Sequence, residues 1–114
     1  MYRLQQLFSD IKKIVNEALE ENRGRPKEAK PGGRIPDQVA AQTVIIKLLA
    51  SIKDWSINFV HKKLTYYPDT TWRKLCGIKY SEIPIRRTLN NRWHHPKIRQ
   101  WQQRIWKRIV HLLD

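Results

Sequence analysis

The sequence predicts an all-α fold: a single compact bundle of about five helices packed around a central helix at residues 37–64. Apolar residues recur with a helical period along three long segments, and prolines and glycines gather between them. No segment shows the clear apolar and polar alternation of a strand. Because 114 residues suffice for one domain with a real core and are few for two, we expect residues 1–114 to form one domain.

The first helix is expected from Tyr2 to about Asn22. Its apolar residues follow the i, i+3, i+4, i+7 spacing of a single helix face. They are Leu4, Leu7, Phe8, Ile11, Ile14, Val15, Ala18 and Leu19. The other face mixes basic and acidic side chains, which is typical of a solvated surface.

A flexible basic loop is expected at residues 23–36, because three prolines and three glycines there oppose both helix and strand. The segment has a single acid, Glu28, among five basic residues. The basic residues are Arg23, Arg25, Lys27, Lys30 and Arg34. Two interpretations stay open: a solvated linker, or a basic arm that becomes ordered on a phosphate backbone.

The central helix is expected to begin near Pro36 and Asp37, since proline is tolerated in a first turn and an acid there suits the helix dipole. It is predicted to continue to Leu64. Its apolar residues spread over more than half of the circumference. A helix that is apolar on most sides packs on two or more neighbours, so we expect this helix to be the hub of the core.

Two shorter helices are expected after Pro68. The first spans Thr71–Cys76, with Asp69 or Thr70 as its N-cap and Gly77 closing it. For the second, at residues 82–93, Ser81 is the expected cap and Pro84 lies in the first turn.

The last helix is expected to begin at Pro96 and to reach about Leu113. Its apolar and cationic residues separate onto two faces by the 3.6-residue period. The apolar face, expected to turn to the core, holds Ile98, Trp101, Ile105, Trp106, Ile109, Val110, Leu112 and Leu113. The polar face holds Lys97, Gln100, Arg104, Lys107, Arg108 and His111.

The charge balance favours a polyanionic partner. Lysine and arginine number 23 against 10 acids, a net charge of +13, and residues 58–114 hold 13 of the cations but 3 of the acids. The single cysteine, Cys76, excludes an intrachain disulfide, so we expect an intracellular, cytoplasmic protein. No apolar run approaches the length of a membrane span, and we expect no membrane binding.

Catalytic motifs are missing from the sequence. It has no HExxH, no CxxC and no phosphate-binding glycine loop, and adjacent His94 and His95 point in different directions. Cys76 is interpreted as a small packing residue near a helix end. A metal-independent nuclease built from histidines is the enzymatic alternative that is left. We expect no enzyme, no metal and no cofactor.

The candidate site is a cationic surface that neutralises several phosphates and releases their counterions. Its expected residues are Lys62, Lys63, Arg73, Lys74, Arg86, Arg87, Arg92, Lys97, Arg104, Lys107 and Arg108. Trp55 and Trp101 have the helical phase of core residues, whereas Trp72 and Trp93 lie near helix ends and are the candidates for stacking on bases.

Two classes of nucleic-acid-binding protein fit these features. In one, residues 71–93 resemble a helix-turn-helix whose second helix ends in a repressor-like pattern and reads bases through arginine and asparagine. The pattern is formed by Ile85, Arg86, Arg87, Leu89 and Asn90. The turn after Gly77 is longer than in that motif, and Pro84 lies in the expected reading helix. A symmetric dimer on a specific DNA site would follow.

In the other class, the short, all-helical, strongly basic chain without a catalytic motif resembles the small subunits of CRISPR effector complexes. That resemblance implies a subunit that stacks with copies of itself and with other proteins and holds a target or displaced strand through its phosphates. We expect this second class, with DNA or RNA as the nucleic acid and no sequence specificity.

Overall fold

The computed structural model describes residues 3–22 and 35–113, without the side chains of Leu112 and Leu113, and within these residues it is all-α, as predicted. Its helices are α1 (Leu4–Asn22), α2 (Asp37–Lys53), α3 (Ile57–Thr65), α4 (Thr71–Cys76), the 3₁₀ turn η1 (Tyr80–Glu82), α5 (Arg86–Trp93) and α6 (Pro96–Leu113). The basic arm expected at residues 23–36 lies, up to Arg34, outside the described residues.

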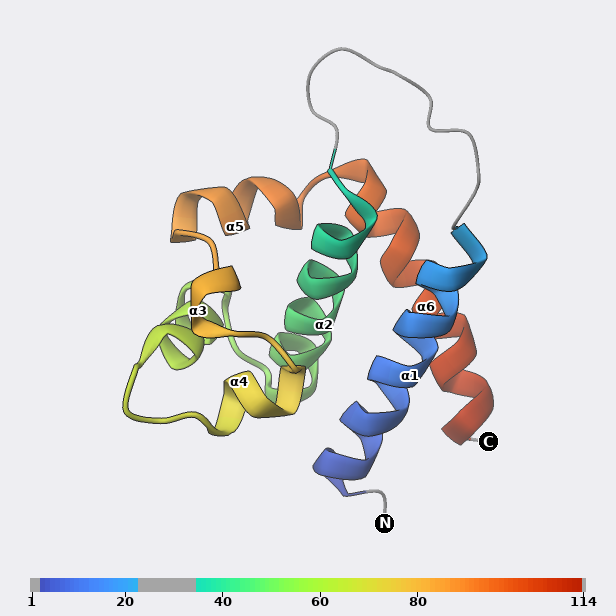
Figure 1. Cartoon of the computed structure of the whole chain (residues 1–114), viewed down its shortest axis with the longest axis horizontal. Coiled ribbons are helices and arrows are strands. Elements are labelled where there is room, and N and C mark those ends of the chain that lie inside the picture. The colour runs from blue at the N-terminus through green and yellow to red at the C-terminus, as the bar shows by residue number, and fades with distance from the viewer. Residues whose placement is uncertain (1–2, 23–34, 114) are drawn as a thin grey trace.

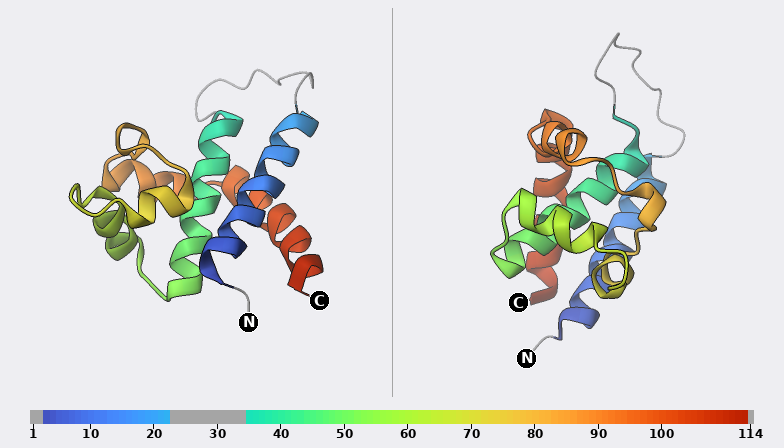
Figure 2. Two further views of the ribbon diagram at one scale, coloured as in Figure 1. Left: turned by 60° about the horizontal axis from the view of Figure 1, so that its bottom comes forward. Right: turned by 90° about the vertical axis from the view of Figure 1, so that its left-hand side faces the viewer.

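Helix α2 is the centre of the bundle, and it packs on α1, α3, α4, α5 and α6. Figures 1 and 2 show α1 and α6 on one side of α2 and the shorter helices on the other. Buried side chains occupy most of the α2 circumference, among them Ala40, Val44, Ile45, Leu48 and Leu49. The prediction of a hub helix at this place in the chain is therefore confirmed.

The expected length of that hub helix was wrong, because α2 ends at Lys53 and α3 begins anew at Ile57. Asp54 adopts the left-handed conformation with φ of 57°, which short polar residues tolerate better than most. Ser56 then caps α3, since its hydroxyl oxygen accepts a hydrogen bond from Phe59 N at 3.1 Å. The break turns α3 away from the α2 axis, so that both elements contact α5.

The helix expected at residues 82–93 is also shorter than predicted, since α5 begins at Arg86. Ile83 precedes Pro84, and a residue before proline favours extended backbone, which Ile83 adopts at φ −79° and ψ 120°. Pro84 consequently lies outside the helix, and its carbonyl accepts a hydrogen bond of 2.8 Å from His61 Nε2. Ile85, not Ser81, is the N-cap position.

Helices α4 and α6 have the predicted bounds, and Gly77 closes α4 in the left-handed conformation with φ of 68°. Helix α6 buries Ile98, Trp101, Ile105 and Ile109 against α1 and α2. The prediction that Trp106 faces the core was wrong, because its side chain is 49% exposed. It lies about 100° from Ile105 around the helix, at the edge of the buried arc.

Candidate nucleic-acid interface

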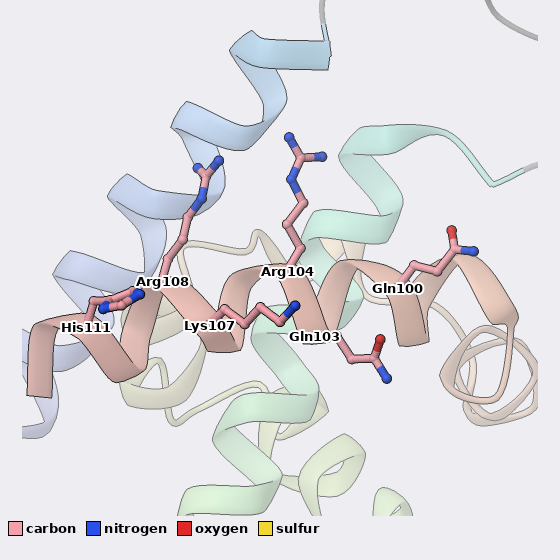
Figure 3. Close-up of a pocket in the computed structure, with 6 residues that line it drawn as sticks. All are labelled: Gln100, Gln103, Arg104, Lys107, Arg108 and His111. Atoms are coloured by element: carbon pink, nitrogen blue, oxygen red, sulfur yellow. The ribbon is translucent and has the colours of Figure 1, made fainter.

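The outer face of α6 forms a shallow depression of about 440 Å³ that contains cationic and amide side chains (Figure 3). Its lining residues are Gln100, Gln103, Arg104, Lys107, Arg108 and His111. Within the described residues, no carboxylate is part of this lining. Three of the cations predicted for the site therefore meet on one helix face, where every lining side chain offers a hydrogen-bond donor.

Glu21 at the end of α1 fixes two of these cations. Arg104 Nη2 donates to its Oε2 at 2.7 Å and Arg108 Nη2 at 2.8 Å. In Figure 3 both guanidinium groups extend on the side of α1. The bonds from Arg108 and Arg104 lower the pKa of Glu21 below its ordinary value. One carboxylate shared by two guanidinium groups leaves this edge of α6 positive.

Arg73 does not fit the prediction of an outward phosphate contact, because it is buried. Its guanidinium group donates to the carbonyl oxygens of Leu64 at 2.8 Å, Tyr66 at 3.0 Å and Tyr67 at 2.8 Å. It also lies 5.4 Å from the ring centroid of Tyr80. Arg73 therefore holds the segment between α3 and α4 in place.

Lys97 is also engaged in the fold. Its Nζ forms an ion pair of 2.7 Å with Asp37 and donates to the carbonyl of Ile35, which joins the starts of α6 and α2. Trp93, one of the stacking candidates, is half-buried with Lys47 over its ring at 5.5 Å. Lys47 Nζ also donates to the Trp93 carbonyl at 3.1 Å.

The remaining predicted cations lie on α3, α4 and α5, outside the lining of the α6 depression. Lys62 and Arg87 are exposed on α3 and α5, and Arg92 is half-buried. Arg86 donates to Asn58 Oδ1 at 3.0 Å, which links α5 to α3. These residues are not brought together with the α6 face. Lys63 lies over the Phe59 ring on α3, and Trp72 and Lys74 line a separate groove beside α4.

Sequence reasoning missed the exposed tyrosines beside Arg73. Tyr66 and Tyr67 are 61% and 71% exposed, and Tyr80 is 48% exposed with its ring 5.3 Å from that of Tyr67 in an edge-to-face pair. The signal in the sequence was the Tyr66–Tyr67–Pro68 run. It lies between two helices, so no helix turns these side chains toward the core. Aromatic side chains exposed in this way are typical of contact surfaces.

The cysteine at the end of α4 is part of the hydrophobic core. Cys76 is buried, and burial raises the pKa of its thiol to about 12, so the reactive thiolate is strongly disfavoured. Among the described residues no group of three or more His, Cys, Asp or Glu side chains is placed to hold a metal ion. In the same part of the chain, no helix combines the length and the apolar character needed to cross a bilayer.

The comparisons with known proteins give no relative: no protein-family model, curated protein or solved structure matches the chain.

Acidification is expected to destabilise the fold. Hydrogen bonds lower the pKa of Glu21 (from Arg108 and Arg104), of Asp69 (from Thr71) and of Glu82 (from the Lys79 N–H and Gln42). Since these pKa values are lower in the folded than in the unfolded chain, the stability they give is fully present above the unfolded-state values. It is lost as the pH falls through the folded-state values, which lie below the ordinary carboxyl pKa values.

Thermal melts followed by circular dichroism between about pH 7 and about pH 3 measure this loss. In Glu21→Gln the midpoint should depend less steeply on pH than in the parent protein. An identical acid profile for both proteins would contradict the role assigned to Glu21.

Proposed function

We propose that this chain is a non-catalytic protein that binds the sugar-phosphate backbone of DNA or RNA as a subunit of a larger nucleoprotein complex, like the small subunits of CRISPR effector complexes. The observation that carries the proposal is the outer face of α6, where six donor-bearing side chains line a depression and two of them, Arg104 and Arg108, share one carboxylate, that of Glu21. Phosphate oxygens accept hydrogen bonds and carry negative charge, so they match this lining.

The chemistry of the face favours backbone contacts over base reading. Lys107 and the two glutamines are exposed, and Arg104 and Arg108 are held by Glu21 at fixed positions along the helix. A shallow depression can contact the sugar-phosphate backbone on the outside of a nucleic-acid strand. It cannot reach the base edges, which lie inside the grooves of a duplex. Such contacts confer affinity and register without sequence information.

Exposed apolar side chains beside the cationic face support a place in an assembly. Trp106 and Val110 are 49% and 37% exposed on α6, next to the donor-lined depression. Tryptophan is enriched in the centres of protein interfaces. A subunit that contacts a neighbouring protein through this edge would place its cations beside the shared nucleic acid.

The packing of α4 and α5 does not support the helix-turn-helix alternative. In that motif two helices pack against each other across a short turn. Here α4 packs mainly on α1, α2 and α3, whereas α5 packs on α2, α3 and α6. Residues 77–85, with η1 among them, separate the two helices.

A salt titration tests the proposed function. Fluorescence anisotropy with random-sequence single-stranded and duplex DNA and RNA should show affinity that falls with salt, with a log–log slope of about −0.7 to −0.9 per phosphate contacted. Lys107→Ala should make this slope shallower by roughly one contact. Glu21→Gln should raise the affinity, because it removes the carboxylate that competes with phosphate for Arg104 and Arg108.

Lys13→Ala, which removes an exposed lysine from α1, is the control of equal charge change. An affinity that does not change with salt concentration would contradict the proposal. So would an equal affinity and salt slope of the Lys107→Ala and Lys13→Ala proteins. Strong preference for one duplex sequence would replace it with a sequence-specific regulator.

A further inference from the structure

A groove of about 650 Å³ lies between α1 and α4, on residues that the α6 face does not use. Cations from both sides line it: Arg3 and Lys12 from the α1 segment and Lys74 from α4. Leu4, Trp72 and Leu75 form its apolar part. Its lining, as far as the structure describes the chain, includes no carboxylate, and its size is that of a small-molecule site.

Lys12 is held at the α4 end of this groove. A Cβ built on Gly77 would meet the Lys12 Cδ at 3.1 Å, so the lysine side chain lies directly against the glycine that closes α4. The same lysine acts on the Cys76 thiol through its charge. The Lys12 side chain therefore lies at the junction of α1 and α4, where it is part of the groove lining.

Trp72 is likewise fixed in place. Its ring makes an edge-to-face contact with Trp55, with 4.9 Å between centroids and 81° between planes. Lys53 Nζ lies 5.2 Å from the centroid of the same ring. The indole is half-buried and still lines the groove, so it offers a rigid aromatic surface to a ligand.

We infer that this groove holds an unpaired nucleotide of a single strand, with its phosphates on Arg3, Lys12 and Lys74 and its base against Trp72. The inference rests on the proposed function and gives its substrate class. Stacking on an aromatic side chain requires a base that is out of a duplex. The bases of a duplex are stacked on each other. Its phosphates would therefore contact the cations of the groove, but no base would stack on the indole of Trp72.

Neighbouring lysines provide a matched test. Lys12 lines the groove, whereas Lys13 is exposed on α1 outside it. Lys12→Gln is expected to weaken binding of an oligothymidylate of about 12 nucleotides roughly three- to five-fold, and Lys13→Gln less than two-fold. Trp72→Leu should weaken single-strand binding roughly five-fold or more and leave duplex binding within two-fold.

A direct readout comes from NMR of the unmodified chain. The indole N–H resonance of Trp72, assigned by its loss in Trp72→Phe, should shift on titration with the oligothymidylate and not with oligoglutamate of equal charge. Equal losses in Lys12→Gln and Lys13→Gln, or an unmoved Trp72 resonance, would overturn the inference while leaving salt-dependent binding by α6 intact. An equal shift with oligoglutamate would assign the groove to acidic peptides instead.

The two proposals fail in different ways. If the parent protein binds no nucleic acid at any salt concentration, the proposed function falls and this inference falls with it. If it binds duplex and single strands with one affinity and one salt slope, the backbone proposal stands and the groove has no part in it.

Discussion

Replacement of Arg73 by leucine is expected to lower the free energy of unfolding by about 3 kcal/mol or more. The change removes the donor from three carbonyl oxygens, those of Leu64, Tyr66 and Tyr67. Each of them would lose a charge-assisted hydrogen bond, which is buried at Leu64 and partly buried at Tyr66 and Tyr67. The cation also lies 5.9 Å and 5.4 Å from the Tyr67 and Tyr80 ring centroids, and that contact is lost as well.

Urea denaturation followed by circular dichroism gives the measurement. Arg87→Leu is the matched control, since Arg87 is exposed on α5, and it should change the free energy by no more than about 0.5 kcal/mol. Arg73→Lys should fall between the two, because an ammonium group cannot serve three carbonyls in the planar geometry of a guanidinium. Equal stability of the Arg73→Leu and Arg87→Leu proteins would contradict the structural role of Arg73.

Truncation of Leu49 to alanine is expected to cost about 2 to 5 kcal/mol. Leu49 is fully buried on α2, the helix on which all five others pack in the described part of the chain. The loss combines the transfer free energy of the removed atoms with the cavity left behind. A thermal melt should show the midpoint reduced by roughly 10 °C or more.

The same helix offers the control. Ile52 lies one turn further along α2 and is 40% exposed, so Ile52→Ala should cost well under half as much. Equal melting midpoints of the Leu49→Ala and Ile52→Ala proteins would contradict the place of α2 at the centre of the core.

Much of the fold could be predicted because its signals are local. The period of α1, the Pro96 start of α6 and the Gly77 stop of α4 each depend on a few neighbouring residues. The end of α2 at Lys53 could not be predicted in this way, since residues 54–56 contain neither proline nor glycine and the apolar period continues through them. At this break Ser56 caps α3, and a tertiary contact adds to this local signal, since Trp55 packs edge-on against Trp72 of α4.

The candidate site was predictable to the extent that it lies on one helix. The cations of α6 share a face by helical phase alone, and the structure places them together. Arg73 could not be separated from them by sequence, because charge gives no measure of burial. The pairing of Glu21 with Arg104 and Arg108, and the groove that joins Lys12 to Lys74, depend on which helices become neighbours in space.

The packing of α1 on α6 also affects how the chain folds during translation. Of the described helices, α1 is translated first and its packing partner α6 last. The apolar face of α1, with Phe8 and Ile11, therefore stays without that partner while the helices between them are made. Contacts between segments so distant along the chain form late because their loop-closure entropy is large. Until α6 emerges, the uncovered apolar face of α1 is therefore a place where nascent chains can associate with one another.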